Sequence, residues 1–297
     1  MAGLMDRLRG PDLLQRARRR LARAIDPPPQ GHPIYLEYPV APSARFGWDL
    51  PVHPQLDRII GAGSGQYRQV LRQILGFADH LAAIPITSSE GSAPHWHNPF
   101  FFGLDAAALY GSLAANKPTR YVEIGSGYST LFAARAIRDH DLPTHILSID
   151  PAPRAEVAAV SDEIVRKPLE RLDLSLFGKI EPGDVVFIDG SHMSFMGSDV
   201  TIAFIEILPK LPAGVLVHIH DVFLPWDYRP DWTNRYYSEQ YLLAAMLLAE
   251  GSRYEIVLPA FYVYNHAELS SILSPLWDRI GLTGYETAGH SFWLRIR

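Results

Sequence analysis

The 297-residue chain is 47% apolar and contains no cysteine. The apolar fraction excludes a disordered or collagen-like chain, and the lack of cysteine excludes a disulfide framework, a thiolate nucleophile and a Cys-ligated metal site. The 27 basic and 32 acidic residues give a formal net charge of −5, which argues against a general nucleic-acid binder.

The N-terminal segment, residues 1–25, carries a charge of +5 from seven arginines and two acids, so the rest of the chain carries −10. Its apolar residues recur at helical spacing opposite Arg16, Arg19, Arg20 and Arg23, which predicts a basic amphipathic helix. Such a helix could dock on its own domain or on a second subunit in a homo-oligomer, or lie on an anionic membrane. The arginine-rich start lacks the apolar core of a secretory signal, and the apolar stretches have about half the length of a membrane span. We therefore expect a cytoplasmic protein, with peripheral membrane contact as an alternative.

The next two segments differ in composition. Eight prolines lie within residues 26–54, too many for a helix or a central strand, so this part is expected to be an extended arm. Residues 66–83 then show helical spacing of apolar side chains, and we interpret residues 55–94 as a helical cap before the main domain, residues 95–297.

Short β-branched runs alternate with helical patterns from residue 120 onward. We expect strands at 120–124, 145–149, 163–166, 184–188, 214–219, 254–264 and 291–296, and helices at 129–138, 155–159 and 199–208. This alternation is typical of right-handed βαβ units. The sequence therefore predicts an α/β, Rossmann-like, doubly wound parallel sheet.

A glycine turn follows the first of these strands. Gly125 and Gly127 permit a tight turn and a close approach of a ligand to the backbone, and Ser129 and Thr130 can cap the helix that follows. The neighbouring strand ends in Asp150, whose carboxylate can reach a ribose diol. Strand, turn, helix and terminal acid together predict a nucleoside cofactor.

Two residues of this turn favour S-adenosylmethionine over NAD. Ser129 stands where a dinucleotide fingerprint has its third glycine. A negative charge on Glu123, two residues before Gly125, would repel a pyrophosphate and attract the ammonium group of an amino acid. An NAD-dependent oxidoreductase on the same fold remains the alternative.

A second group of polar residues follows the strands at 184–188 and 214–219. Asp189 and His192 come after the first, and His220 and Asp221 after the second. Because these two strands are neighbours in a doubly wound sheet, the four catalytic candidates should converge beside the cofactor.

Two chemical uses fit this group. Asp189, His220 and Asp221 could bind a divalent metal ion that lowers the pKa of a substrate hydroxyl. Alternatively, His192 or His220 could accept the proton of the acceptor as a general base, oriented by a carboxylate. His218, one pleat deeper, is expected to be a buried core residue, and Asp221 could instead cap a loop.

The aromatic segment at residues 223–237 follows directly and is a candidate lid over the acceptor. It could instead be an apolar patch buried against the N-terminal arm or a partner. The side chains that we expect to contact the substrate are Trp226, Tyr228, Trp232 and Arg235 from this segment, and Trp96 and Asn98 from the other side of the pocket.

The motifs Val122-Glu-Ile-Gly-Ser-Gly-Tyr-Ser129, Ser148-Ile-Asp150, Phe187-Ile-Asp-Gly-Ser-His192 and His218-Ile-His-Asp221 resemble those of the class I S-adenosylmethionine-dependent methyltransferases. Within them, the chain is similar to a bacterial subgroup with Asp-Gly-Ser-His and His-Asp motifs, over residues 95–297. The resemblance implies a seven-stranded sheet with an antiparallel last strand and a long loop between Tyr264 and Ser291.

The resemblance also implies roles for individual residues. Glu123, Gly125 and Gly127 would line the methionine end of the cofactor, Asp150 would bind the ribose, and residues 168–170 would lie near the adenine. The full predicted cofactor set is Glu123, Gly125, Ser126, Gly127, Ser129, Asp150, Pro168, Leu169 and Asp189.

The expected function is methyl transfer from S-adenosylmethionine to an oxygen or nitrogen of a small polar acceptor, with or without a divalent metal ion. The alternatives are a metal-dependent enzyme that does not methylate, an NAD-dependent oxidoreductase, and a non-catalytic scaffold.

Overall fold

The computed structural model describes residues 37–38, 40–88, 91–153, 157–249 and 252–297. The chain divides into two compact units, 1–41 and 42–297, and the second unit contains the sheet and the helices that cover it. The basic helix predicted for residues 1–25 lies outside the described residues.

A seven-stranded sheet forms the centre of this unit, in the order β3-β2-β1-β4-β5-β7-β6. The first five strands pair in parallel, and β7 pairs antiparallel with both β5 and β6. The strands are β1 (Arg120–Ile124), β2 (His145–Ile149), β3 (Glu163–Val165), β4 (Val185–Ile188), β5 (Leu216–Ile219), β6 (Tyr254–Pro259) and β7 (Phe292–Ile296). The predicted Rossmann-like sheet with an antiparallel last strand is therefore confirmed.

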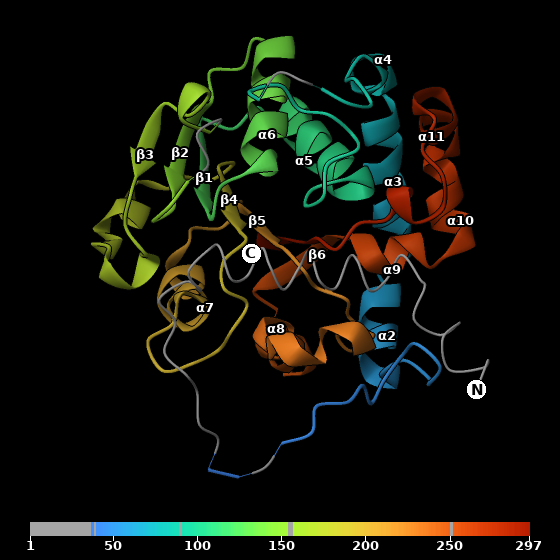
Figure 1. Ribbon diagram of the computed structural model, residues 1–297, viewed down its shortest axis with the longest axis vertical. Helices are drawn as coiled ribbons and strands as arrows, with labels where there is room; N and C mark the ends of the chain where they lie inside the picture. The colour runs from blue at the N-terminus through green and yellow to red at the C-terminus, as the bar shows by residue number, and fades with distance from the viewer. Residues whose placement is uncertain (1–36, 39, 89–90, 154–156, 250–251) are drawn as a thin grey trace, which may run out of the picture. The chain divides into compact units, whose positions relative to one another are not determined.

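Helices cover both faces of the sheet. In Figure 1, α5 (Gly103–Asn116) and α6 (Tyr128–Asp139) lie on one side of it, and α7 (Asp199–Ile202) and α8 (Glu239–Leu248) on the other. All four residues of β4 and of β5 are buried. A sheet covered on both faces explains why its central strands have continuous apolar runs rather than alternating patterns.

The helical cap consists of three short helices, α2 (Pro54–Gly61), α3 (Ser64–Leu75) and α4 (Ala78–Ala82). Helix α3 buries Tyr67, Leu71 and Ile74. Ile74 packs on Gly111 of α5 so closely that a Cβ atom there would lie 2.9 Å from Cγ1 of Ile74. This contact attaches the cap to the helical layer that covers the sheet.

The sequence was misleading where apolar runs are buried on all sides. The predicted strand at 254–264 is β6 followed by α9 (Ala260–Tyr264), because a short apolar run fits a buried helix as well as a buried strand. The predicted helix at 199–208 is a single turn, α7, followed by a π-helical segment, η5 (Ala203–Ile207), and a 3₁₀ turn, η6 (Leu208–Lys210).

The long loop expected between Tyr264 and Ser291 is mostly helical. It contains α10 (Ala267–Ser270), η8 (Ser271–Leu273), α11 (Ser274–Ile280) and η9 (Gly284–Thr287). The remaining 3₁₀ turns, η2 (Val157–Ala159), η3 (Leu169–Arg171), η4 (Leu174–Lys179) and η7 (Pro230–Arg235), connect or flank strands.

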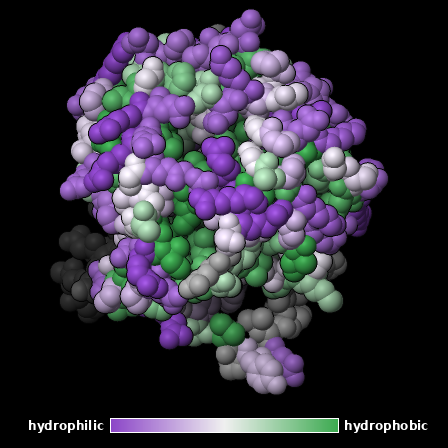
Figure 2. Space-filling model, turned by 180° about the vertical axis from the view of Figure 1, so that it is seen from behind, coloured by the Kyte–Doolittle hydropathy of each residue, from purple (hydrophilic) through white to green (hydrophobic). Residues whose placement is uncertain are grey.

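The surface opposite the view of Figure 1 is largely hydrophilic, and its hydrophobic side chains gather around a hollow near the middle (Figure 2). Within the described part of the chain, no helix has the length and apolar character that crossing a membrane requires.

Candidate active site

The carboxyl ends of β1, β2, β4 and β5 bring the predicted site residues to one edge of the sheet. The register pairs Ile124 with Ile149 and Ile188, and Ile188 with Ile219, so the residues that follow these four positions are neighbours. The predicted convergence of the glycine turn, Asp150 and the two later motifs is confirmed.

The turn after β1 requires a glycine because of its neighbouring strand. Gly125 has φ of +80°, and a Cβ atom there would lie 1.8 Å from the carbonyl oxygen of Asp189. Its N–H donates to the carbonyl of Ile149 at 2.9 Å. The turn is therefore held between the ends of β2 and β4.

Asp150 is bound to this turn through Ser126. The backbone N–H of Ser126 donates to Oδ2 of Asp150 at 2.9 Å, and the Ser126 hydroxyl donates to the same atom at 3.2 Å. The other oxygen accepts from the N–H of Ala152 at 2.7 Å. A carboxylate has about four acceptor sites, so this half-buried group can still accept hydrogen bonds from a ribose diol.

Glu123 lies beneath the turn and not on its surface. Its carboxyl group accepts hydrogen bonds from the hydroxyls of Tyr121 (3.0 Å), Ser129 (3.3 Å), Ser148 (2.8 Å) and Thr130. Thr130 also accepts from the N–H of Gly127, the residue that precedes α6. Glu123 thus ties β1, β2 and the start of α6 together.

This burial changes the role expected for Glu123. The residue is 0% exposed, and burial raises the pKa of its carboxyl group to about 7, although the four hydroxyl donors oppose the rise. Near neutral pH the group is therefore only partly charged. Both Glu123 and Ser129 are buried and hydrogen-bonded within the turn, and their contact with the cofactor stays a prediction.

The segment predicted to lie near the adenine follows β3. Pro168 is half-buried and precedes η3, whose first residue, Leu169, is 4% exposed and packs in the core. Contact of this segment with the adenine remains a prediction.

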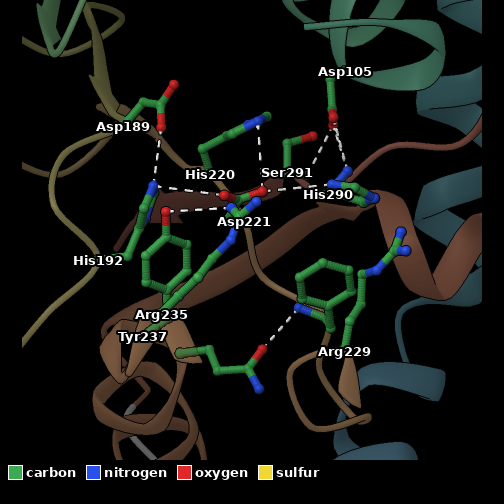
Figure 3. A network of polar contacts seen from close by, with 12 residues as sticks. Asp105, Asp189, His192, His220, Asp221, Arg229, Arg235, Tyr237, His290 and Ser291 are labelled. Carbon is green, nitrogen blue, oxygen red and sulfur yellow. Dashed lines mark hydrogen bonds and ion pairs between the residues drawn. The ribbon is translucent and has the colours of Figure 1, made fainter. Parts of the chain in front are cut away.

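His192 is the centre of the second group of polar residues (Figure 3). Its Nε2 atom lies 3.2 Å from Oδ1 of Asp189 and 3.6 Å from Oδ2 of Asp221. Its Nδ1 atom lies 2.8 Å from Oε2 of Glu239, the first residue of α8. The imidazole is therefore held by three carboxylates from three segments of the chain.

The three carboxylates determine the charge of this imidazole. Burial alone would lower the pKa of His192, but the hydrogen bonds with Asp189 and Glu239 raise it well above its ordinary value. His192 is therefore a cation near neutral pH. The exposures of its partners differ sharply, since the side chain of Glu239 is 0% exposed and that of Asp189 is 35% exposed.

Asp221 joins the remaining histidines to this group. Its Oδ1 atom lies 3.5 Å from Nδ1 of His290 and 3.9 Å from Nε2 of His220. Burial would raise the pKa of Asp221, but the hydrogen bond from His290 and the charges of His220 and His192 hold it well below its ordinary value. The pKa of His220 is raised, because the charges of Asp189, Asp221 and Asp105 outweigh its burial.

His218 is the core residue that the sequence predicted. It is fully buried, its Nε2 atom lies 3.2 Å from Nδ1 of His220, and its ring stacks on Phe187. Burial, with the nearby charge of His220, lowers its pKa well below the ordinary value.

Two residues of the group have strained backbones. His192 and Asp221 have φ of +59° and +53°, a region that costs non-glycine residues about 1–3 kcal/mol and that concentrates at functional sites. The N–H groups of Ser238 and Glu239 donate to the His192 carbonyl at 2.8 and 3.1 Å, which holds this conformation.

The metal role predicted for Asp189, His220 and Asp221 receives no support from the described residues. Nowhere in the described ranges do three or more His, Asp or Glu side chains lie where they could hold a metal ion together. The Nε2 atom of His192 instead faces the carboxylates of both Asp189 and Asp221, as a bound cation would. The arrangement fits an imidazolium between the two carboxylates, and metal binding stays a prediction.

The aromatic segment divides into a buried part and a part beside the site. Trp226 packs on Phe261 and against Gly47, and the buried Tyr228 packs on Phe223. This part is the patch against the N-terminal arm that the sequence offered as an alternative. Contact of Trp226 and Tyr228 with the acceptor has no support in this packing.

The second part of the segment reaches the site through Tyr237. Its ring lies 4.6 Å from the ring of His192, and Trp232 packs edge-on against it at 5.7 Å. Arg235 lies over the Trp232 ring at 4.0 Å. Trp232 and Arg235 therefore lie near His192, and their contact with the acceptor stays a prediction.

Trp96 and Asn98 have structural roles. Trp96 is 1% exposed and packs on Phe132 and Trp277. The Asn98 side chain bonds the backbone of His95, Phe100 and Phe101. Both residues line one wall of a cavity of about 420 Å³, with Phe102 and Tyr285 among the other lining residues. Both residues therefore support this wall, and their direct contact with the substrate stays a prediction.

Four residues of this network were not predicted from the sequence, namely Asp105, Glu239, Tyr285 and His290. Asp105 of α5 accepts the backbone N–H groups of His290 and Ser291 at 2.8 to 2.9 Å. The Tyr285 hydroxyl lies 2.6 Å from Nε2 of His290. The one available signal was the polar pair His290-Ser291 directly before an apolar strand.

The chain is similar to one family of known domains over the part that holds this site. A family model described as "Methyltransferase domain" matches residues 122–222. None of the curated proteins is significantly similar to the chain.

Solved structures with a similar arrangement are more distant. The SAH-bound methyltransferase PaMTH1 from Podospora anserina is 17% identical, over 85% of this chain and 100% of its own, with a TM-score of 0.38. Cofactor-bound Rv0187 from MTB is 17% identical, over 77% and 90%, with a TM-score of 0.41. The [4+2]-cyclase SpnF is 16% identical, over 75% and 93%, with a TM-score of 0.32.

Proposed function

We propose that the chain is a class I S-adenosylmethionine-dependent methyltransferase and that it methylates an oxygen atom of a small polar acceptor bound beside Asp189. The match of residues 122–222 to a methyltransferase-domain family supports the first part of this proposal. The observation that carries the proposal is the buried His192 imidazole between three carboxylates, at the same sheet edge as the glycine turn. The NAD-dependent and non-catalytic alternatives receive no support from the family match.

The residues at the glycine turn fit an adenosyl cofactor. Asp150 presents a half-buried carboxylate at the end of β2, and the turn at 125–127 brings backbone close to the end of β4. Asp150 would hold the ribose, and the turn the methionine end. When bound, S-adenosylmethionine supplies a methyl group that is open to nucleophilic attack.

Methyl transfer is an in-line displacement, so the chain must place the acceptor oxygen, the methyl carbon and the sulfur in a row. Asp189 follows the strand next to β1, and its side chain is 35% exposed, which makes it the most accessible of the carboxylates around His192. An acceptor hydroxyl can donate its hydrogen bond to this carboxylate and be oriented by it.

The acceptor hydroxyl must also lose its proton. The sequence assigned this step to His192 or His220, but the pKa of His192 is raised well above its ordinary value and that of His220 is also raised, which favours the protonated form of both. We therefore assign the proton to the Asp189 carboxylate, with His192 as the residue that positions it through Nε2. Glu239, bonded to Nδ1, fixes the ring orientation. An amine can attack before it loses a proton, so a proton acceptor at this position supports an oxygen acceptor.

The test is transfer of tritium from methyl-labelled S-adenosylmethionine into a fractionated extract of small metabolites. We expect label in the small-molecule fraction, as an ether or ester. Asp189→Asn should lower the rate about 100-fold or more, the usual range for loss of general base catalysis. Asp278→Asn, an exposed change on α11, is the control and should have no effect. Label confined to amines, or an unchanged rate in Asp189→Asn, would contradict the proposal.

A further inference from the structure

Two arginines of the aromatic segment differ in their partners. Arg229 makes two hydrogen bonds with the carboxylate of Asp231, at 3.0 and 3.2 Å. Arg235 makes no ion pair with any acid of the described chain, and its hydrogen bond is to the Tyr237 hydroxyl, at 3.4 Å. Arg229 is thus paired with a carboxylate, whereas Arg235 acts on the nearby Asp231 only through its charge, beyond ion-pair distance.

Aromatic rings hold the Arg235 guanidinium in place. Its carbon Cζ lies 4.0 Å from the centre of the Trp232 ring and 5.4 Å from that of Tyr237. A guanidinium that stacks by its face keeps its N–H groups free at the edge, where they match the two oxygens of a carboxylate or phosphate. The stacking also reduces the side-chain freedom that would be lost on binding an anion.

Arg235 lies next to the reacting groups. The ring of Tyr237, to which it is hydrogen-bonded, lies 4.6 Å from the His192 ring. Figure 3 shows Arg235 and Tyr237 entering the network from the same side as His192. One aromatic ring therefore separates the guanidinium from the imidazole that binds Asp189.

Resting on the function proposed above, we propose that the acceptor carries an oxyanion, a carboxylate or a phosphate, that Arg235 binds while the acceptor hydroxyl reaches Asp189. In such an acceptor, the anionic group and the hydroxyl would be separated by about the width of one aromatic ring. The guanidinium, which has no ion pair within the described chain, attracts the anionic end, and the Asp189 carboxylate repels it, so the two groups together fix which end reacts.

The experiment measures binding to the full-length protein saturated with S-adenosylhomocysteine, by calorimetry. The probes are 4-hydroxybenzoate, 4-hydroxyphenyl phosphate and the neutral 4-hydroxybenzyl alcohol. We expect at least one anionic probe to bind about 10-fold or more tighter than the neutral one, and the better of the two identifies the oxyanion.

Variants of Arg235 show whether that preference comes from this side chain. Arg235→Gln should weaken binding of the anionic probe about 10-fold or more. The affinity of Arg235→Lys should fall between those of Arg235→Gln and the wild type, because lysine keeps the charge but lacks the planar fork of donors. Arg138→Gln, at an exposed arginine of α6, is the control. Circular dichroism confirms that each variant is folded.

Three results would overturn the inference: equal binding of the neutral probe, no binding of either anion, or an unchanged affinity in Arg235→Gln. Failure of the wild type to bind S-adenosylhomocysteine would instead overturn the proposed function, so the two failures are distinguishable.

Discussion

Oε2 of Glu239 lies 2.8 Å from Nδ1 of His192, although 47 residues separate the two in the chain. Helix α8 therefore supplies the buried partner that orients the imidazole, and backbone N–H groups at its start hold the strained His192 carbonyl. This relationship joins the loop after β4 to the helical layer beneath it, and it makes the charge of His192 depend on a residue outside the sheet.

Replacing Glu239 tests that dependence. The hydrogen bond and the charge of Glu239 both raise the pKa of His192, so Glu239→Gln should lower that pKa. The measurement is a pH titration of the imidazole nitrogens by NMR. Glu268→Gln, at a side chain 81% exposed, is the control. An unchanged His192 pKa in Glu239→Gln would contradict the assigned contact.

The same contact has a consequence for stability. The folded-state pKa of His192 lies above its unfolded value near 6.5, so its stabilising contribution is complete below that pH and is lost as the pH rises through the folded value. Urea unfolding between about pH 6 and pH 9 should show this loss, and it should be smaller in Glu239→Gln. If the free energy of unfolding fell equally with pH in the wild type and in Glu239→Gln, the result would be inconsistent with this linkage.

Glu123 should make the free energy of unfolding depend on pH in a lower range than His192 does. Its pKa rises from 4.5 to about 7 on folding, so the protonated form is favoured in the fold. The contribution of the protonated carboxyl group to the free energy of unfolding is complete below pH 4.5. It is lost as the pH rises to about 7, and this loss amounts to about 3 kcal/mol.

Glu123→Gln removes this titration. Relative to the wild type, the free energy of unfolding of the variant should therefore rise by about 3 kcal/mol between pH 4.5 and about pH 8. The exposed change Glu170→Gln serves as the matched control. A constant difference between variant and wild type across that range would show that Glu123 does not titrate as described.

Gly125 should not tolerate a side chain. In Gly125→Ala the new Cβ atom would meet the Asp189 carbonyl oxygen at 1.8 Å, at a φ of +80°. We expect a loss of about 2–4 kcal/mol in the free energy of unfolding, as for other overpacked and strained sites, and loss of S-adenosylhomocysteine binding.

Gly65 provides the comparison. It lies within α3 with open space around its Cα, so Gly65→Ala should stabilise the protein by about 0.5–1 kcal/mol. Chemical denaturation of the two variants measures both effects. Equal stabilities would refute the proposed requirement for glycine at the turn.

Asp227 should fix the proline-rich arm to the aromatic segment. Oδ2 of this buried residue accepts the backbone N–H groups of Arg45 and Phe46. Asp227→Ala leaves these donors without their partner, so we expect the free energy of unfolding to fall by about 2–3 kcal/mol. We also expect faster proteolysis within residues 42–53. Asp49→Ala, in the exposed part of the same arm, should change neither. Protection of the arm in Asp227→Ala would disprove the attachment.

Much of the fold could be predicted because strand ends and glycine turns are local features. The bounds predicted for β1 and β2 match the structure, since each is an apolar run between polar or turn residues. Helices α5 and α8 could not be found in this way. Helix α5 is buried over most of its length and α8 is largely apolar, so neither shows the one-sided pattern of a surface helix.

The candidate site was only partly predictable for a related reason. Asp189, His192, His220 and Asp221 follow strands, and sheet topology brings strand ends together. Glu239 reaches His192 only through the packing of a helix, for which the sequence has no local signal. The full burial of Glu123 and Trp96 could not be predicted either, because it depends on how distant segments pack around them.

The most direct test of the cofactor site is calorimetric titration of the full-length protein with S-adenosylhomocysteine. We expect a dissociation constant in the micromolar range, about −7 to −8 kcal/mol of binding free energy. Asp150→Ala, which removes the carboxylate at the end of β2, should weaken binding about 10-fold or more. No binding at a ligand concentration of about 1 mM would contradict the assignment of this site to the cofactor.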